Sequence, residues 1–209
     1  MKQSTNNHQN QAGFTILELM IAMTVFTILL MICLVTFLQI GRVFSKGVNM
    51  TLVQEDARNI TSSITSDIQF YNKPFTPVVI TSTDHQTKYF CIGNHEYKFL
   101  LGAHVGYGAA FGLKRTDISG SCPDPAGDTS GAEMAGNSMQ LNNLTVSCPN
   151  GLCTVTINLV FYGVDNTVFE SPSGSTPAYK AADAQCTGAL AGSQYCATAN
   201  YSSTVLESY

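Results

Sequence analysis

The residues best suited to chemistry in this sequence lie close together, at Gly13, Phe14 and Glu18. They stand where a polar stretch meets an apolar run, and residues 19–38 carry no formal charge. A helix rises about 1.5 Å per residue, so a run of this length covers about 30 Å, enough to cross the hydrocarbon core of a bilayer. A carboxylate in lipid costs roughly 2.5–3.5 kcal/mol at the centre of a helix and less near an interface. We therefore expect Glu18 to have a partner.

Residues 1–13 form a short polar segment whose one charged side chain is Lys2. A secretory signal peptide places its apolar core before a small-residue cleavage site. Here the order is reversed, because the small residues Ala12 and Gly13 precede the apolar run. Cleavage after Gly13 would discard the leader, keep the hydrophobic helix and free an amine on Phe14, close to the carboxylate.

Gly13, Phe14, Thr15 and Glu18, with the apolar run after them, resemble the class III signal of type IV pilins and pseudopilins. The resemblance implies cleavage between Gly13 and Phe14 by a prepilin peptidase, and N-methylation of Phe14. It also implies that Glu18 pairs with the Phe14 ammonium of a neighbouring subunit, which neutralises two charges that lipid disfavours. The partners it implies are other pilins in a helical filament, the prepilin peptidase/methyltransferase, an inner-membrane platform protein, the assembly ATPase machinery and the membrane.

The resemblance predicts a structural subunit and not an enzyme, since no catalytic constellation is visible. Residues 97–99 and 112–115 resemble those of larger minor pilins and J-type minor pseudopilins, which favours a minor pilin of a type IV pilus or related filament. The alternatives are a minor pseudopilin of a type II secretion or DNA-uptake system, and a tip adhesin that binds through loops 120–138 and 171–195. The chain is expected to span the inner or cytoplasmic membrane once, with its C-terminal head outside, and then to enter an extracellular or periplasmic filament.

Seven cysteines occur, and Cys33 lies in the apolar run, where a small hydrophobic role is expected. The other six form an even set in the part expected to be exported, which favours up to three disulfides. The pairs suggested by short loops, one connectivity among many, are Cys148 with Cys153 and Cys186 with Cys196, which leaves Cys91 with Cys122. Zinc sites need a C-x2-C spacing or nearby His ligands, and neither occurs, so these cysteines predict no metal.

A helical apolar pattern continues beyond the membrane-length run to residue 71. Its apolar residues recur at spacings of three and four, and they are Phe44, Val48, Leu52, Val53, Ala57, Ile60, Ile64 and Ile68. The sequence therefore predicts one long helix, with a transmembrane/assembly part at 14–40 and an amphipathic part at 41–72 whose stripe packs on the head. Gly41 and Gly47 are weak points, since glycine costs up to about 1 kcal/mol inside a helix.

Residues 73–209 are expected to form one β-rich head, which together with the helix gives an α+β, pilin-like fold stabilised by disulfides. Short β-type runs alternate there with Gly, Pro, Asn and Ser, and they cover 78–82, 88–92, 97–101, 112–115, 140–147, 154–162 and 203–206. Pro149-Asn150-Gly151 lies between two of these runs and predicts a hairpin.

The head offers few candidates for binding chemistry. Asp124, Asp128 and Glu133 fall in one loop, and calcium is an alternative there because oxygen-rich loops bind it. They lack the regular spacing of a calcium loop, so a solvated acidic loop is the preferred interpretation and no cofactor is predicted. Lys and Arg number 10 against 14 Asp and Glu, with no basic run, so direct nucleic-acid binding is not expected.

Overall fold

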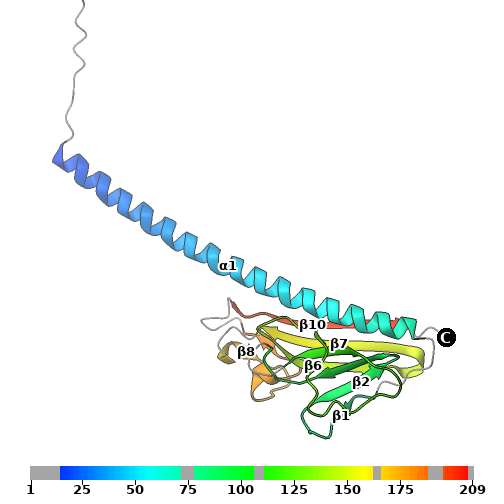
Figure 1. The fold of residues 1–209 in the computed structure, drawn as a ribbon. Coiled ribbons are helices and arrows are strands. Elements are labelled where there is room, and N and C mark those ends of the chain that lie inside the picture. Colours follow the sequence, from blue (N-terminus) through cyan, green and yellow to red (C-terminus); the bar gives the residue numbers. More distant parts are fainter. Residues whose placement is uncertain (1–14, 72–77, 106–110, 162–165, 188–194, 207–209) are drawn as a thin grey trace, which may run out of the picture. The chain divides into compact units, whose positions relative to one another are not determined.

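The computed structural model describes residues 15–71, 78–105, 111–161, 166–187 and 195–206. Two compact units divide the chain, residues 1–41 and 42–209. The long helix α1 (Ile16–Phe70) contributes to both units, as Figure 1 shows. The leader and Phe14 lie outside the described residues.

Helix α1 is unbroken over 55 residues. The chain has no proline before Pro74, so no residue of the helix lacks a backbone N–H. Gly41 and Gly47 lie inside the helix without interrupting it, and a Cβ added at either position would meet open space. By length and composition α1 is able to cross a membrane.

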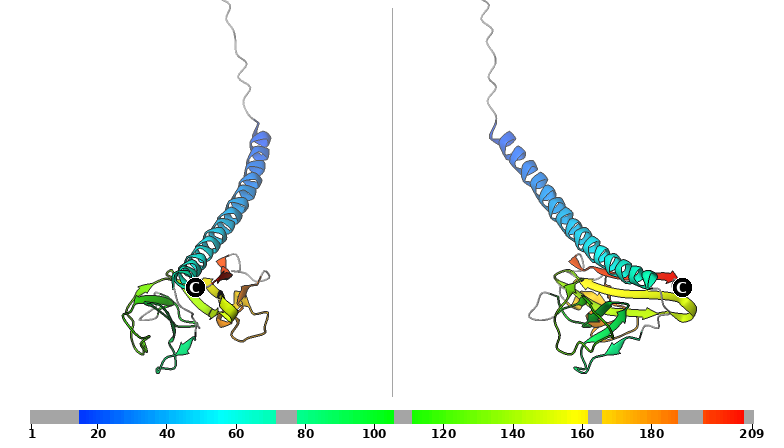
Figure 2. Two further views of the ribbon diagram at one scale, coloured as in Figure 1. Left: turned by 90° about the vertical axis from the view of Figure 1, so that its right-hand side faces the viewer. Right: turned by 45° about the vertical axis from the view of Figure 1, so that its right-hand side comes forward.

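The head is built mainly from two antiparallel sheets. The five-stranded sheet has the order β1-β2-β3-β4-β5, with strands β1 Ile80–Thr81, β2 Lys88–Ile92, β3 His95–Phe99, β4 Leu113–Asp117 and β5 Ala132–Glu133. The three-stranded sheet has the order β10-β7-β6, with β6 Met139–Ser147, β7 Leu152–Phe161 and β10 Thr198–Leu206. Figure 2 shows β7 and β10, in yellow and red, beside the C-terminal part of α1.

Short elements complete the head. A two-stranded sheet pairs β8 (Phe169–Glu170) with β9 (Gln185–Cys186), and three 3-10 turns are η1 Pro149–Gly151, η2 Asn166–Val168 and η3 Ala178–Lys180. The turn η1 joins β6 to β7, where the sequence predicts a hairpin. Asn150 and Gly151 both have positive φ there, at 55° and 78°, the conformation for which these residue types are favoured in turns.

One hydrophobic core joins the head to the C-terminal part of α1. The helix residues in it are fully or almost fully buried and are Val53, Ala57, Ile60, Ile64 and Ile68. Side chains of both sheets complete the same cluster, among them Tyr97, Phe99, Leu113, Leu141, Val155 and Ile157. Both sheets therefore pack on one helix. The structure confirms the predicted α+β fold with a long N-terminal helix.

The predicted apolar stripe is wrong at its N-terminal end. Phe44, Val48 and Leu52 are 71%, 42% and 46% exposed, and they take no part in the core of the head. Full burial starts only at Val53, the first helix residue of the core that the two sheets share with α1. The helical spacing of the apolar residues is therefore as predicted, but Phe44, Val48 and Leu52 form an exposed apolar surface instead of packing on the head.

Three disulfides hold the head, and they join the same pairs that the loop spacing suggests. Cys91–Cys122 ties β2 to the loop after β4 across a sequence separation of 31. Cys148–Cys153 closes the β6–β7 hairpin, and Cys186–Cys196 links β9 to the segment before β10. Such crosslinks stabilise a fold mainly by restricting the unfolded chain. Cys33 is a free, exposed thiol on α1.

Candidate functional site

The first turn of α1 positions Glu18. The helix begins at Ile16, and the hydroxyl of Thr15 just before it accepts a hydrogen bond from the Glu18 N–H at 3.2 Å. A Thr followed three residues later by Glu is the capping-box pattern, which marks a helix N-terminus. The positive end of the helix dipole also favours a carboxylate in this turn. The sequence prediction overlooked this cap, although Thr-x-x-Glu is readable at residues 15–18.

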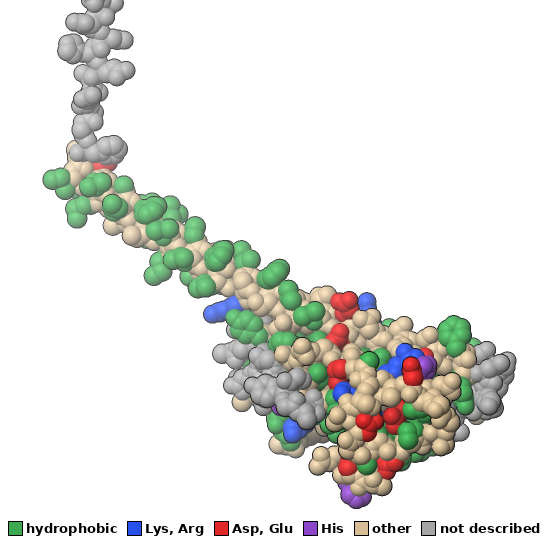
Figure 3. Space-filling model, in the orientation of Figure 1, with side chains coloured by type: hydrophobic (Ala, Val, Ile, Leu, Met, Phe, Trp, Pro, Cys, Tyr) green, Lys and Arg blue, Asp and Glu red, His purple; other side chains and the backbone are tan. Residues whose placement is uncertain are grey.

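Glu18 is the one charged residue among residues 15–41. Its neighbours are apolar and outward-facing, with Ile16, Leu17 and Met20 at 81%, 69% and 65% exposed. Figure 3 shows hydrophobic side chains covering this part of the helix. A countercharge for Glu18 therefore has to come from outside residues 15–41. Gly13 and Phe14, the expected processing residues, lie outside the described residues.

Three threonine hydroxyls of this segment are satisfied by the helix itself. The hydroxyls of Thr24, Thr27 and Thr36 each donate to a main-chain carbonyl three or four residues earlier, at 2.8 Å. Such bonds let hydroxyls lie in lipid without an unpaired donor. Glu18 is therefore the one formal charge in a segment that otherwise suits a membrane, with Gln39 near its C-terminal end.

An apolar groove lies on α1 just before the buried stripe begins. It is open to solvent, has a volume of about 400 Å³ and is lined by Phe44, Gly47, Val48, Thr51 and Leu52. The absent side chain of Gly47 helps to hollow it, and the Thr51 hydroxyl donates back to the Gly47 carbonyl at 2.9 Å. The groove offers a site where another apolar helix can pack.

A partly buried carboxylate fastens the C-terminal end of α1 to the five-stranded sheet. Asp67 accepts hydrogen bonds from the Tyr97 hydroxyl at 2.6 Å and from Arg115 Nη2 at 3.2 Å. His95 Nε2 lies 3.9 Å from the same carboxylate, and His95 Nδ1 lies 2.8 Å from Asp117 Oδ1. Burial and the bond to Asp67 raise the pKa of Tyr97, so the phenol remains a donor. These contacts anchor the C-terminal end of the helix to the sheet.

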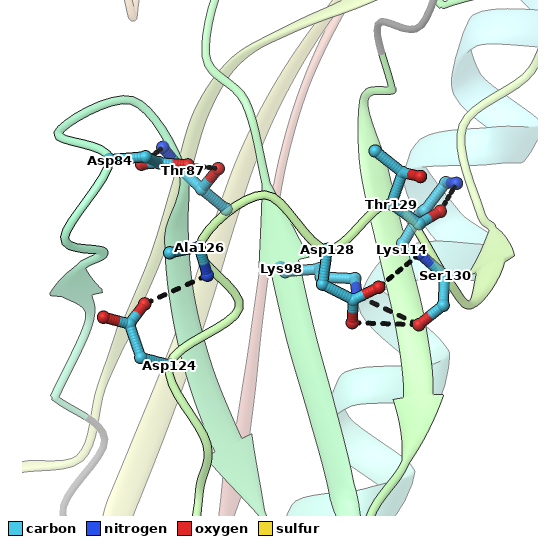
Figure 4. Close-up of polar contacts among 9 residues, drawn as sticks. All are labelled: Asp84, Thr87, Lys98, Lys114, Asp124, Ala126, Asp128, Thr129 and Ser130. Atoms are coloured by element: carbon cyan, nitrogen blue, oxygen red, sulfur yellow. Dashed lines mark hydrogen bonds and ion pairs between the residues drawn. The ribbon is translucent and has the colours of Figure 1, made fainter.

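The acidic loop between β4 and β5 is held against the sheet by two lysines (Figure 4). Lys98 is fully buried on β3 and donates to Asp128 at 2.6 Å. This hydrogen bond, with those from Ser130, lowers the pKa of Asp128 to about 2. Lys114 donates to the carbonyl of Thr129 on the same loop. The loop is therefore clamped by two lysines of adjacent strands.

The three carboxylates considered as calcium ligands accept hydrogen bonds from different parts of the head. Asp124 accepts from the Ser82 hydroxyl and from the Ala126 N–H, and Asp128 accepts from Lys98. Glu133 accepts backbone N–H bonds, including that of Leu113 at 2.9 Å. Within the described ranges no cluster of three or more His, Cys, Asp or Glu side chains is arranged to hold a metal. The arrangement is that of a structured loop.

A family comparison recognises the N-terminal region. Residues 8–34 match the family described as Prokaryotic N-terminal methylation motif. No curated protein and no solved structure gives a significant match to the chain. The matched residues include Gly13, Phe14 and Glu18, and they are the signal of type IV pilins and pseudopilins to which the sequence points.

Proposed function

We propose that this chain is a minor pilin, a structural subunit of a type IV pilus or related filament. It is cleaved after Gly13, N-methylated at Phe14 and assembled through its N-terminal helix. The methylation motif supports a pilin-like or pseudopilin subunit, and pilins are structural proteins and not enzymes. The narrower assignment to a minor subunit rests on the size and β-rich character of the head.

The observation that carries the proposal is the position of Glu18. It is the lone charge of a helix segment made otherwise for lipid, and it lies in the first turn, next to the expected cleavage site. Cleavage after Gly13 supplies an ammonium at Phe14, the countercharge that the segment itself lacks. Pairing with the ammonium of a neighbouring subunit sets the axial step between subunits and removes two charges from lipid.

The apolar groove on α1 supports assembly of the same kind. Its residues are exposed, and they precede the stripe that the head covers. Helices that associate away from water do so by close packing, and Gly47 permits a close approach. In the proposed filament this groove receives the helix of an adjacent subunit.

The motif and the helix fit a protein anchored in a membrane before it enters an extracellular filament with other pilins, after processing by a peptidase. We propose further that the head lies outside the inner or cytoplasmic membrane. An inner-membrane platform protein and an assembly ATPase extract the processed subunit into the fibre.

A substitution at the cleavage site tests this function. Gly13→Val is expected to abolish processing almost completely, since a β-branched side chain removes the close backbone access that glycine gives. The precursor then stays in the membrane fraction and is missing from sheared filaments, as measured by gel mobility and immunoblotting. Gly41→Ala is the matched control, because the added Cβ meets open space, and it should be processed and assembled normally. Filaments that contain uncleaved Gly13→Val protein would overturn the proposal.

A further inference from the structure

The outer face of the five-stranded sheet buries two charged residues of β3. Tyr97 and Phe99 of this strand belong to the hydrophobic core. Side chains alternate along a strand, so Glu96 and Lys98 project from the opposite face. The loop between β4 and β5 is held against that face, and Glu96 and Lys98 are only 1% and 0% exposed. Glutamate and lysine are almost never buried to this extent, which marks the place as chemically unusual.

The Lys98 amine and the Asp128 carboxyl group are in contact across this buried layer. Lys98 Nζ lies 2.6 Å from Asp128 Oδ2, and Figure 4 shows the lysine reaching from β3 to the loop. Ser130 fixes the carboxyl group, because its N–H donates to Oδ1 at 2.8 Å and its hydroxyl donates to Oδ2 at 2.9 Å. Two reacting groups held in this way behave as at a very high effective concentration. The Asp128 side chain is 46% exposed, so a small leaving group can escape to solvent.

Glu96 is placed to move protons between these two groups. It lies two residues from Lys98 on the same face of β3, and the charges of Lys98 and Asp128 act on its carboxyl group. Burial raises the pKa of Glu96, and it outweighs the lowering effect of Lys98. Glu96 Oε1 is buried and has no hydrogen-bond partner among the described residues. A protonated carboxyl group can donate a proton from one oxygen and accept one at the other.

The neighbours of Lys98 disfavour its positive charge. In the register of the sheet Lys98 lies directly opposite Lys114 of β4, and like charges directly opposite one another are destabilising. On the other side it lies opposite Tyr89 of β2, which is 7% exposed and keeps water away. Conversion of the ammonium group into a neutral amide removes both the repulsion and a buried charge.

We propose that Lys98 and Asp128 form an isopeptide bond, with Glu96 carrying the protons. Glu96 donates its proton to Asp128 Oδ2 and takes one from the Lys98 ammonium, which leaves a neutral amine beside a neutral acid. The Nζ–Cγ bond forms, the Cγ–Oδ2 bond breaks, and Oδ2 leaves as water with a second proton from Nζ. The N–H of Ser130 stabilises the negative charge that develops on Oδ1. One ion pair gives one amide and one water, so atoms and charge balance and no oxidant is needed.

The bond gives the loop between β4 and β5 a second covalent attachment. Cys91–Cys122 ties the start of this loop to β2, and Lys98–Asp128 ties a later part of it to β3. Unlike the disulfide, the amide persists under reducing conditions. The inference rests on the chemistry of the head alone and holds whether or not the proposed function is correct.

Mass spectrometry of the reduced full chain, purified in detergent, tests the bond. The chain should be lighter than its processed sequence by the mass of one water. Trypsin should not cut after Lys98, so residues 89–114 should remain linked to residues 116–180, while cleavage after Lys114 is the internal control. A chain of full mass that yields a free peptide ending at Lys98 overturns the proposal. Loss of water with these peptides unlinked, as from cyclisation of an aspartate onto its own backbone, overturns it as well.

Three variants test the roles of the residues, with circular dichroism to check that each is folded. Lys98→Arg keeps the charge but removes the amine, and it should remain unlinked. Glu96→Gln keeps the shape but not the transferable proton, so linkage followed over time after synthesis should be slower by about a hundredfold or more. Lys114→Arg is the matched control on the adjacent strand and should be linked like the wild type. Linkage of residue 128 in folded Lys98→Arg, or linkage of Glu96→Gln at the wild-type rate, contradicts the proposal.

Discussion

Replacement of Glu18 by alanine is expected to leave a processed, membrane-inserted protein that does not enter a filament. The substitution removes one partner of an ion pair and leaves the Phe14 ammonium unpaired in lipid. Stranding one charge of a buried pair costs roughly 3–5 kcal/mol. At about 1.4 kcal/mol per factor of ten, incorporation should fall by about two to three and a half orders of magnitude. The measurement is the amount of the chain in sheared filaments relative to the membrane fraction.

The control for this experiment is Glu55→Ala. Glu55 is a carboxylate of the same helix, but it is exposed and lies beyond the apolar segment. Its removal should leave both processing and incorporation unchanged. Glu18→Gln separates charge from size, because it keeps the shape of the side chain and should fail as alanine does. Filaments that incorporate Glu18→Ala at the wild-type level would refute the role of Glu18 in assembly.

The second large effect is expected in the core, at Ile64. Its side chain is fully buried among residues of both sheets. Ile64→Ala removes apolar contacts and leaves a cavity, which should lower the free energy of unfolding by about 2–5 kcal/mol. For a chain of this size each kcal/mol corresponds to roughly 2–4 °C in Tm, so thermal denaturation in detergent should show a clear decrease.

Leu52→Ala is the matched control for the core. Leu52 lies on the same helix, but it is 46% exposed and outside the core. Its truncation should change Tm by less than about a third of the Ile64→Ala effect. Equal losses of stability for the two variants would show that the head covers the helix further toward its N-terminus than the structure describes.

The sequence predicts the helix better than it predicts the strands. Helix α1 shows a long apolar run followed by a 3.6-residue pattern, both of which are local signals. What the sequence does not reveal is where the head stops covering the helix, since Phe44, Val48 and Leu52 fit the same pattern as the buried residues. The point at which the head stops covering the helix depends on the length of the sheets, and no local sequence pattern encodes that length.

The strands of the head illustrate the same limit. The central strands β2, β3, β6 and β7 lie close to their predicted ranges, because each carries several β-favouring residues. The two-residue strands β5, β8 and β9 are too short to show any alternation, and they were missed. Strand β10 begins at Thr198 and not at residue 203, since its exposed N-terminal half has little apolar character to predict it.

Some residues of the candidate site can be predicted from the sequence, and others cannot. Gly13, Phe14 and Glu18 are recognisable from sequence because their chemistry depends on spacing along one segment. The Asp67 anchor is not, because Tyr97 and Arg115 reach it from strands that are 30 and 48 residues away in the chain. Interactions of this kind become visible only when the packing of helix against sheet is known.

The mature N-terminus is the most direct test of the account as a whole. The chain should be recovered from cells with an active prepilin peptidase, digested, and its N-terminal peptide analysed by mass spectrometry. We expect a peptide that begins with N-methylated Phe14 and contains Glu18. A chain that still carries residues 1–13 under these conditions would contradict the account.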